Sequence, residues 1–511
     1  MTLTPRRHLT VACILTAFCL GSTPAPALAR TGVVVGSKAF PESWVLAEAL
    51  ARVLRSEGVP RVEHRNNLGG TEIVYQALRA GDVDAYPEYT GTIAQVILHR
   101  SVSTSLSGMR RVLSREGIGV SDPLGFNDSY ALAVTKNVRE RYRLESISDL
   151  ARHPELKLGL THEFLGRPDG WPGLVRHYGL SMPHVLGIQH ELAYTALERG
   201  RIDVTDIYTT DAEIERLRLH VLRDDRGFFP RYDAVWLYRL DLGRREPRAV
   251  RAMHRLTGRI DEAAMIRANA RVVLGHRSYG EAADSLLAET LPSGQERTPA
   301  ATNTLWGGIL RNTGRHLSLV LISLLLAVLA GIPLGVLAAR SPWLGSAILS
   351  VTGLLQTIPS LALLAALIPL FGIGAVPALI ALFLYSLLPI VRNTYVGLTT
   401  LPGPLAEAAD AIGLSPRAQL LRVRLPMASP AIMAGIKTSA VINVGTATLA
   451  ALIGAGGLGE PILSGIQLRQ GSLILQGAVP AALLALLVQR AFDLVDRVAI
   501  PRGLRLPPSP R

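Results

Sequence analysis

The sequence predicts a protein of two parts: an exported α/β region of two lobes, followed by an all-α polytopic membrane region of about five helices. Hydrophobic residues make up 49% of the 511 residues and charged residues only 18%, a balance typical of membrane proteins. The apolar residues are also distributed unevenly. Residues 30–300 form a mixed, charged sequence, whereas long apolar runs begin near residue 316. This composition excludes a disordered chain, a collagen-like chain and an ordinary cytosolic protein.

The N-terminus has the pattern of a secretory signal peptide. Arg6-Arg7 is followed by the apolar run Leu9–Leu20 and by Ala27-Leu28-Ala29, which fits an A-x-A cleavage site. Both cysteines of the chain, Cys13 and Cys19, lie within this segment, so cleavage would leave a mature chain without a disulfide. An uncleaved signal anchor is the alternative. In either case the first of the two parts is exported.

The exported part alternates β-branched runs with amphipathic stretches at helical spacing, which predicts an α/β fold with mostly parallel sheets. Three such units, each a short run followed by an amphipathic stretch, are Val33–Val35 then Ser43–Glu57, Val62–His64 then Glu72–Ala80, and Leu156–Leu160 then Trp171–Tyr178. About 270 residues is too much for one such core, so two lobes with a cleft between them are expected.

Five apolar runs follow, each long enough for the ~20 residues that cross a bilayer core. They lie at about 316–339, 345–370, 375–397, 429–453 and 472–492. With the exported part outside, five spans place the arginine-rich segments after spans one, three and five inside the cell, as the positive-inside rule requires. From residue 303 onward, fourteen Lys or Arg stand against five Asp or Glu, which accounts for +9 of the net charge of +13. No basic stretch is interleaved with aromatic residues, so nucleic-acid binding is excluded.

These patterns divide the chain into five segments. They are a signal peptide at 1–29, an extracytoplasmic domain at 30–298, a polar linker at 299–315, a membrane domain at 316–497 and a cytoplasmic tail at 498–511. The protein is expected in the bacterial inner membrane, with the exported domain on the periplasmic side.

Two polar features interrupt the predicted spans. The second span contains the break Gln356–Ser360, which includes Pro359 and is either a proline kink or part of a pathway wall. The fourth span contains Lys437, whose ammonium is expected to reach toward the cytoplasmic face.

The segment after the third span has a specific spacing. It reads Glu407-Ala408-Ala409, three residues, Gly413, nine residues, and then Val423-Arg424-Leu425-Pro426. This resembles the EAA loop of ABC importer permeases, E-A-A-x3-G-x9-I-x-L-P, with valine in place of isoleucine. A short helix ended by glycine can sit in a groove of another protein and move as a rigid body. The resemblance implies two copies of a separate ATPase subunit and a second copy of the permease domain as partners; a plain amphipathic loop helix is the alternative.

Further segments extend the resemblance to the glycine betaine/carnitine/choline importers. The membrane part, over about 305–500, resembles their permeases through Leu354–Leu361, Gly445–Leu449 and Gly454–Glu460. The exported part resembles their type II-like periplasmic binding proteins through Gly36–Phe40, Asn67–Thr71, Tyr86–Thr92, Phe126–Ala131 and Phe228–Tyr232. The chain therefore looks like a binding protein and a permease fused into one subunit.

In that family, tyrosines close an aromatic cage around a quaternary ammonium, which cannot donate hydrogen bonds and favours ring faces. The matching positions are all tyrosine here: Tyr89, Tyr130, Tyr208 and Tyr232. Thr92 belongs to the same motif, and Ser43 stands where the family usually has a glutamine that touches the ligand. The departure at Ser43 leaves the cage intact but puts recognition of the other end of the ligand in doubt. An ordinary core position is the alternative for any one of these tyrosines.

The sequence contains no G-x-x-x-x-G-K-[ST] phosphate loop, no Cys/His metal cluster and no G-x-S-x-G motif. We therefore expect a transporter subunit without its own ATPase and without a cofactor. Its expected cargo is a compatible solute of the glycine betaine, choline or carnitine type. Another soft cation, such as a trimethylated histidine derivative, is one alternative, and a membrane-anchored solute sensor is a second. An enzyme is a weaker third.

Overall fold

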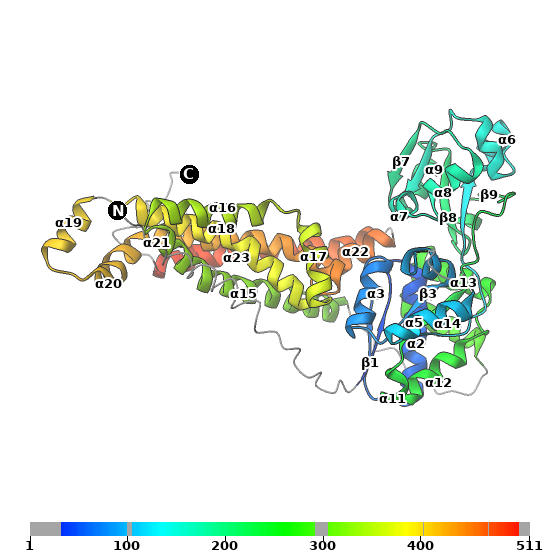
Figure 1. Cartoon of the computed structure of the whole chain (residues 1–511), viewed down its shortest axis with the longest axis horizontal. Helices are drawn as coiled ribbons and strands as arrows, with labels where there is room; N and C mark the ends of the chain where they lie inside the picture. Colours follow the sequence, from blue (N-terminus) through cyan, green and yellow to red (C-terminus); the bar gives the residue numbers. More distant parts are fainter. Residues whose placement is uncertain (1–31, 100–104, 292–304, 402, 469, 500–511) are drawn as a thin grey trace, which may run out of the picture.

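The computed structural model describes residues 32–99, 105–291, 305–401, 403–468 and 470–499. A two-lobed α/β region lies at one end of a bundle of long helices, so the predicted two-part architecture is confirmed (Figure 1). The predicted signal peptide, with Cys13 and Cys19, lies outside the described residues, and so does most of the predicted tail.

Lobe 1 is built on a five-stranded sheet with the strand order β2-β1-β3-β10-β4. Its strands are β1 (Val33–Gly36), β2 (Val62–Arg65), β3 (Ala85–Tyr89), β4 (Ile118–Val120) and β10 (Ala234–Arg239). Strand β10 runs antiparallel to both β3 and β4, whereas β1 is parallel to β2 and β3. The helices of this lobe are α2 (Pro41–Ser56), α3 (Thr71–Ala80), α4 (Thr90–Thr92), a π-helix (Ile93–Ile97), α5 (Leu106–Leu113), α11 (Leu242–Arg245), α12 (Pro247–Leu256), α13 (Glu262–Val273) and α14 (Tyr279–Thr290).

Lobe 2 repeats this plan with the strand order β7-β6-β8-β5-β9. Its strands are β5 (Tyr130–Val134), β6 (Leu158–Thr161), β7 (Val185–Ile188), β8 (Val204–Tyr208) and β9 (His220–Leu222). Its helices are α6 (Lys136–Tyr142), α7 (His162–Gly166), α8 (Trp171–Tyr178), α9 (His190–Glu198) and α10 (Glu213–Arg216). The chain crosses from lobe 1 to lobe 2 between β4 and β5 and returns between β9 and β10. These two connecting segments form the hinge between the lobes.

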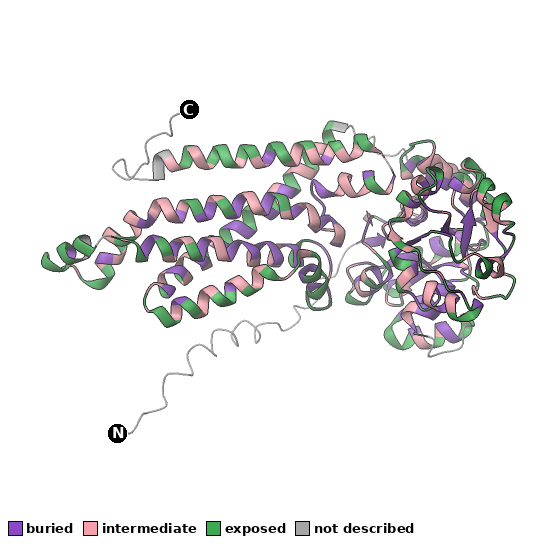
Figure 2. Cartoon of the chain, turned by 90° about the horizontal axis from the view of Figure 1, so that it is seen from above, coloured by how far each residue is buried: buried purple, intermediate pink, exposed green. Residues whose placement is uncertain are grey.

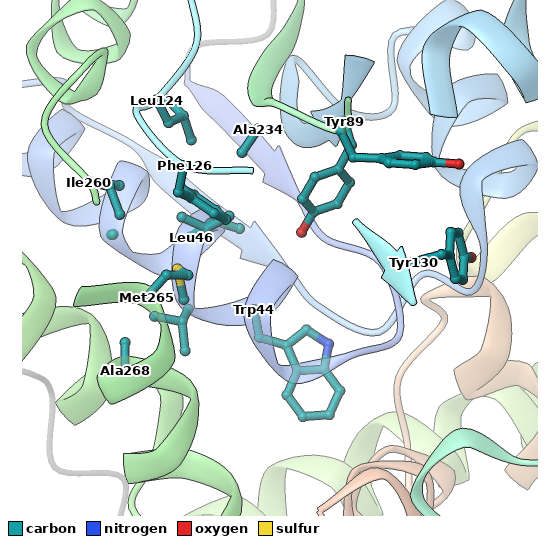
Figure 3. Packing of buried hydrophobic residues seen from close by; sticks show 14 of the residues in the cluster. Trp44, Leu46, Tyr89, Leu124, Phe126, Tyr130, Ala234, Ile260, Met265 and Ala268 are labelled. Carbon is teal, nitrogen blue, oxygen red and sulfur yellow. The ribbon is translucent and has the colours of Figure 1, made fainter. Parts of the chain in front are cut away.

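The core of lobe 1 is organised around α2, whose apolar side chains recur at helical spacing. Trp44, Leu46 and Leu50 are buried on it and belong to the same cluster as Phe126 and Met265 (Figure 3). Full burial of each such side chain contributes about 1.5–3 kcal/mol. The same cluster extends to the ring of Tyr130 at the start of lobe 2, so the core continues into the seam between the lobes.

The membrane part consists of long helices with short connections. They are α15 (Leu305–Ala338), α16 (Pro342–Thr357), α17 (Ser360–Phe371), α18 (Ala375–Thr399), α19 (Gly403–Ala411), α20 (Pro416–Gln419), a π-helix (Leu420–Arg424), α21 (Leu425–Thr446), which continues as a 3-10 helix (Ala447–Ile453), α22 (Gly459–Gln467) and α23 (Gly471–Ala499). Four of the described helices are long and apolar enough to span a membrane, and the bent pair α16–α17 makes a fifth if it counts as one span.

The predicted second span is therefore broken rather than straight. α16 and α17 meet at 95° at the Gln356–Ser360 break. Tyr385 of α18 donates its hydroxyl to the carbonyl oxygen of Ile358 over 2.6 Å, which satisfies a backbone group released by the bend. The break is sharper than a simple proline kink.

One further prediction differs from the structure. α15 begins at Leu305, so part of the predicted linker at 299–315 is helical; Arg311 and Arg315 hid this first section from an apolar search. The reach of Lys437 toward the cytoplasmic face stays a prediction; in the structure its ammonium pairs with Asp493 of α23. An opposite charge on a neighbouring helix is the ordinary partner for a lysine at this depth.

Close helix packing in the bundle depends on small residues. A Cβ on Gly331 of α15 would lie 2.8 Å from Ile390 of α18, and one on Gly335 would lie 2.4 Å from Thr394. This small-x-x-x-small spacing lets the two backbones approach closely, as in many membrane helix pairs. Figure 2 shows exposed residues along the outer surfaces of the bundle, and many of them are leucines. An apolar outer surface is what a lipid environment requires.

Candidate functional site

Four tyrosines from both lobes converge at the mouth of the seam. Tyr89 ends β3, Tyr130 begins β5, Tyr208 ends β8, and Tyr232 lies two residues before the start of β10. The antiparallel register pairs Tyr130 directly with Tyr208, so these two rings are neighbours by strand pairing alone. Strand ends from two sheets therefore bring together residues that are far apart in the sequence.

The rings surround one small cavity, which we call the cage. The ring centres of Tyr130 and Tyr208 lie 5.1 Å apart and those of Tyr130 and Tyr232 lie 5.7 Å apart. Phe40 stacks 6.4 Å from Tyr89 and 6.0 Å from Tyr208. The cavity measures about 20 Å³, roughly the space of one water molecule. A solute can enter only when the lobes separate.

Two cations also line the cage. The ammonium of Lys38 lies 4.8 Å from the ring centre of Tyr89 and pairs with the buried carboxylate of Glu88 over 2.6 Å. The guanidinium of Arg167 lies 5.2 Å from the ring centre of Tyr130 and is held by Asp169 over 2.6 Å. Lys38 belongs to lobe 1 and Arg167 to lobe 2, so positive charge faces the cage from both sides.

The tyrosine hydroxyls differ in what they contact. Tyr89 donates to Glu42 and Tyr232 donates to Asp169, each over 2.6 Å, and both acceptors are buried carboxylates. The hydroxyl of Tyr130, in contrast, is 3.5 Å from that of Tyr208, which is a weak contact. Two rings of the cage are therefore fixed by strong hydrogen bonds and two are held mainly by packing.

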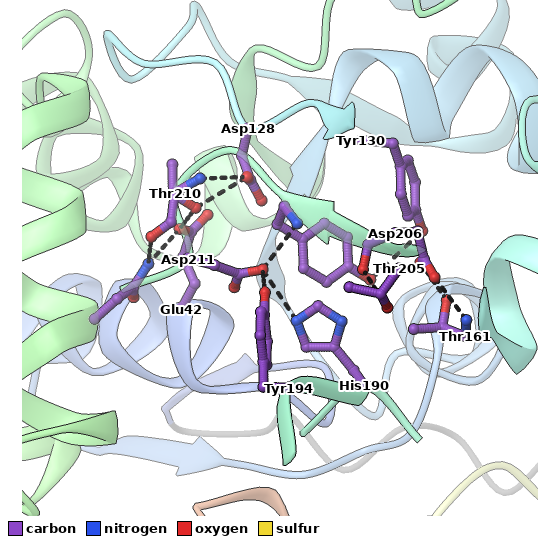
Figure 4. A network of polar contacts seen from close by, with 12 residues as sticks. Glu42, Asp128, Tyr130, Thr161, His190, Tyr194, Thr205, Asp206, Thr210 and Asp211 are labelled. Atoms are coloured by element: carbon purple, nitrogen blue, oxygen red, sulfur yellow. Dashed lines mark hydrogen bonds and ion pairs between the residues drawn. The ribbon is translucent and has the colours of Figure 1, made fainter. Parts of the chain in front are cut away.

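Behind Tyr89, a buried polar network joins the lobes (Figure 4). The hydroxyl of Thr210 is 2.6 Å from Glu42 and 2.9 Å from Asp128. A hydroxyl has one proton, so it cannot donate to both carboxyl groups, and one of them must carry a proton. Burial, together with the negative charge of Glu42, raises the pKa of Asp128 well above its usual range. Burial raises the pKa of Glu42 as well, but hydrogen bonds from Thr210, from Tyr89 and from Asn269 (2.8 Å) oppose this rise, so Asp128 is the member of the pair that holds the proton.

A second pair supports Tyr208 from behind. The ring of His190 lies 4.8 Å from that of Tyr208, and its Nε2 is 3.1 Å from Asp211. Burial opposes the charge on His190, but Asp211 outweighs it and raises the pKa of His190 to about 10. Asp211 also accepts from the hydroxyl of Tyr194 and from the backbone N–H of Tyr208. Among the residues that the structure describes, no group of three or more His, Cys, Asp or Glu could hold a metal ion.

The remaining predicted ligand residues occupy different places. Thr92 lines the cage and accepts from Arg167 over 3.3 Å. Ser43 does not line it; its hydroxyl accepts from the backbone N–H of Lys38 over 2.9 Å and so helps to position that residue. Sequence reasoning did not single out five other lining residues: Lys38, Phe40, Asp128, Glu163 and Arg167. The first three lie in motifs already quoted, whereas no local pattern marked Glu163 or Arg167.

The segment with the EAA spacing lies at the end of the bundle opposite the two lobes (Figure 1). Glu407 and Ala408 are exposed on α19, whereas Ala409 is buried. Gly413 has φ of +73° and its N–H bonds to Asp410, which ends α19 in a left-handed turn. Gln419 of α20 reaches back to Asp410 and closes the segment into a compact hairpin. Leu425 and Pro426 then begin α21, so the hairpin continues directly into a membrane helix.

Exposed apolar side chains on this hairpin mark it as a contact surface. Ile412 is 74% exposed in the turn after α19, and Leu421 is 54% exposed in the π-helix that precedes α21. Apolar residues exposed at a compact projecting segment are typical of protein–protein contact.

Comparison with known proteins agrees with both halves of this description. The family model for the substrate binding domain of ABC-type glycine betaine transport systems matches residues 31–289, and that for the inner membrane component of binding-protein-dependent transport systems matches residues 331–502. The chain belongs to the glycine betaine family of ABC importers. It carries the substrate-binding domain and the permease domain in one polypeptide and is an integral membrane protein.

Individual relatives cover one half or the other. The choline transport permease OpuBB of Bacillus subtilis is 44% identical over 199 residues, which span 39% of this chain and 92% of that protein. The ergothioneine transport permease/binding protein EgtU of Helicobacter pylori is 31% identical over 259 residues, 49% of this chain and 46% of that one. A crystal structure of a glycine betaine/carnitine/choline ABC transporter is 29% identical, covers 50% of this chain and 97% of that chain, and has a TM-score of 0.44.

Proposed function

We propose that this fused importer subunit captures a solute with a quaternary ammonium at one end and a carboxylate at the other, such as glycine betaine or carnitine, and passes it across the membrane. One observation carries the proposal: four tyrosine rings and two cations, Lys38 and Arg167, line the same closed cavity. Ring faces attract an ammonium that has no N–H to donate.

The two cations decide between a zwitterion and a simple cation. A carboxylate can form charge-assisted hydrogen bonds with the ammonium of Lys38 and with the guanidinium of Arg167. Choline has a hydroxyl in that place, and a hydroxyl accepts hydrogen bonds from charged donors more weakly than a carboxylate does. The cage therefore favours betaines over choline. Lys38 and Arg167 bind the carboxylate end of the ligand, which the hydroxyl of Ser43 does not reach because it accepts from the backbone N–H of Lys38.

The permease half couples transport to ATP hydrolysis by a separate subunit. We infer that the hairpin from α19 to the start of α21 docks on a separate ATPase subunit, with Glu407, Ala408, Ala409 and Gly413 at the contact and Leu425-Pro426 leading into the membrane. A second copy of the permease completes the pore, and each copy engages one of two ATPases. The binding domain then lies on the periplasmic side, since it is at the opposite end of the bundle.

Ligand binding by the purified full-length chain tests the cage. Isothermal titration should give glycine betaine at least ten times the affinity of choline, and at least ten times that of 3,3-dimethylbutanoate, in which carbon replaces the charged nitrogen. Equal binding of the butanoate would exclude the aromatic cage, and equal binding of choline would exclude the carboxylate contact. Uptake of labelled betaine by cells that also express the cognate ATPase tests transport.

A trimethylated histidine derivative is the second candidate, because it is also a betaine and because one relative of this chain, EgtU, is named for ergothioneine. Its imidazole ring needs more room than glycine betaine does, so including it in the same titration separates the two. A membrane-anchored sensor would bind the solute without uptake, and the exposed EAA hairpin favours transport over that alternative.

A further inference from the structure

Lobe 1 of the binding domain is seated directly on the membrane part of the same chain. Leu68, in the loop between β2 and α3, is fully buried. A Cβ on Gly454, at the end of the 3-10 helix after α21, would lie only 2.4 Å from Cδ2 of Leu68. Leu68 shares a continuous hydrophobic cluster with Leu367, Ile373 and Ile453 of the membrane part. The leucine therefore fills a site that exists only because position 454 has no side chain.

A polar contact lies beside this leucine. The carboxylate of Asp82 accepts the backbone N–H of Ile373 over 3.0 Å, in the turn between α17 and α18. A Cβ on Gly372 would lie 2.1 Å from Oδ2 of Asp82, so this turn is shaped closely around the carboxylate. Gly372 also has φ of +72°, a conformation that glycine adopts without strain.

A second contact area lies on the other side of lobe 1. Gln470, in the connection between α22 and α23, donates to Nδ1 of His276 over 3.1 Å. Leu468 is buried in the hydrophobic cluster of lobe 1, the same cluster that includes Trp44. Two separate areas therefore fix the orientation of lobe 1, since one contact alone would permit rotation about it.

Lobe 2 stands clear of the bundle (Figure 1). All the contacts described above come from lobe 1, and the ligand cavity between the lobes has room for about one water molecule. Opening is thus required for ligand exchange, and only lobe 2 can swing without breaking the apolar and polar contacts of Leu68, Asp82 and His276.

We infer that lobe 1 is anchored on the permease domain of its own chain, and that lobe 2 alone moves when ligand enters and leaves. This inference rests on the proposed function only for the identity of the ligand. Undocking lobe 1 would expose Leu68 and Leu468 to water and leave the N–H of Ile373 without its acceptor, which disfavours a cycle of detachment.

Disulfide trapping tests the anchor in the full-length chain. Residues 30–511 contain no cysteine, so Asp82→Cys with Gly372→Cys, in a Cys13→Ser/Cys19→Ser background, reports on a single pair. Copper-phenanthroline oxidation of membranes should produce a bond within one chain, without a covalent dimer on a non-reducing gel. The yield should stay within twofold with and without glycine betaine and during ATP turnover. Each single-cysteine variant is the matched control and should give no bond within the chain.

A second pair does not depend on Asp82. His276→Cys with Gln470→Cys, bridged by a short bis-maleimide, should also link within one chain, and the linked protein should bind labelled betaine within twofold of the unlinked protein. A covalent dimer would show docking on the partner copy, and a severalfold loss of yield in any state would show detachment. A tenfold loss of binding on linking would show that lobe 1 has to move. Any of these results overturns the inference. Failure of betaine to bind the unmodified protein would instead count against the proposed function, and the gel result on the anchor would remain valid.

Discussion

The tyrosines of the cage should separate the role of a ring from the role of a hydroxyl. Tyr130→Phe keeps the ring face and loses only a hydroxyl contact of 3.5 Å with Tyr208, so binding should change by less than twofold. Tyr130→Ala removes the ring. A desolvated cation–π contact is worth about 2 kcal/mol, and 1.4 kcal/mol corresponds to tenfold, so affinity for betaine should fall roughly thirtyfold.

Tyr232→Phe should behave differently, because the hydroxyl of Tyr232 donates to buried Asp169 over 2.6 Å. Losing that donor leaves a buried carboxylate less satisfied, at a cost of about 1–3 kcal/mol to folding. The melting temperature of the binding domain should fall by about 2–4 °C for each kcal/mol. The partner Arg167 remains on Asp169 and limits the loss to the lower part of that range.

Isothermal titration and scanning calorimetry on the same protein samples measure the two effects. Tyr130→Phe is the control for Tyr232→Phe, because both remove one hydroxyl and keep one ring. Equal melting temperatures for the two phenylalanine variants would refute the assignment of the Asp169 hydrogen bond. A thirtyfold loss in Tyr130→Phe would refute recognition by the ring face.

Three other predictions test the support of the cage, the topology and the coupling. The pKa of His190 is raised from 6.5 to about 10, so its pair with Asp211 contributes stability that is complete below pH 6.5 and is lost as pH rises through 10. His190→Gln should therefore flatten the fall in melting temperature between pH 7 and 10. An unchanged slope would contradict this role of the pair. A cysteine replacing exposed Ser415 should react with an impermeant maleimide only from the cytoplasm, and one replacing exposed Arg199 only from outside; the opposite pattern would invert the topology. Replacing Glu407 by Ala should abolish uptake and leave betaine affinity within twofold, whereas a loss of both would indicate a folding role.

Local patterns in the sequence were sufficient for the elements that carry a clear period. The strands β1 and β2, the helices α3 and α8 and the apolar helices of the bundle all lie where hydrophobic spacing or length predicts them. β3 was not predicted, although it is central in its sheet, because it contains Pro87, which normally argues against an inner strand. Its partner strand β10 lies nearly 150 residues further along the chain, and a local hydrophobic pattern cannot predict so distant a partner.

In the site as well, some residues follow from local sequence motifs and others depend on distant parts of the chain. The family motifs gave the four tyrosines as candidates, but Glu163 and Arg167 enter the cage only because α7 folds against β6 and the lobes close. The bend between α16 and α17 was visible as a polar break with a proline, but the hydroxyl that satisfies its released carbonyl comes from Tyr385 of the following helix. Tertiary partners, rather than propensity, determine these features.

The charged side chains around the cage bear on which ligand the proposed site would select. Lys38 and Arg167 stand over two of its rings, and each is already paired with a carboxylate, Glu88 or Asp169. A simple cation has no carboxylate to accept hydrogen bonds from these two charged donors. A betaine brings a carboxylate for those groups and an ammonium for the rings, so both ends of the ligand add favourable contacts. On the proposed function, the cage would therefore discriminate against choline through the acceptor that choline lacks rather than through its ammonium.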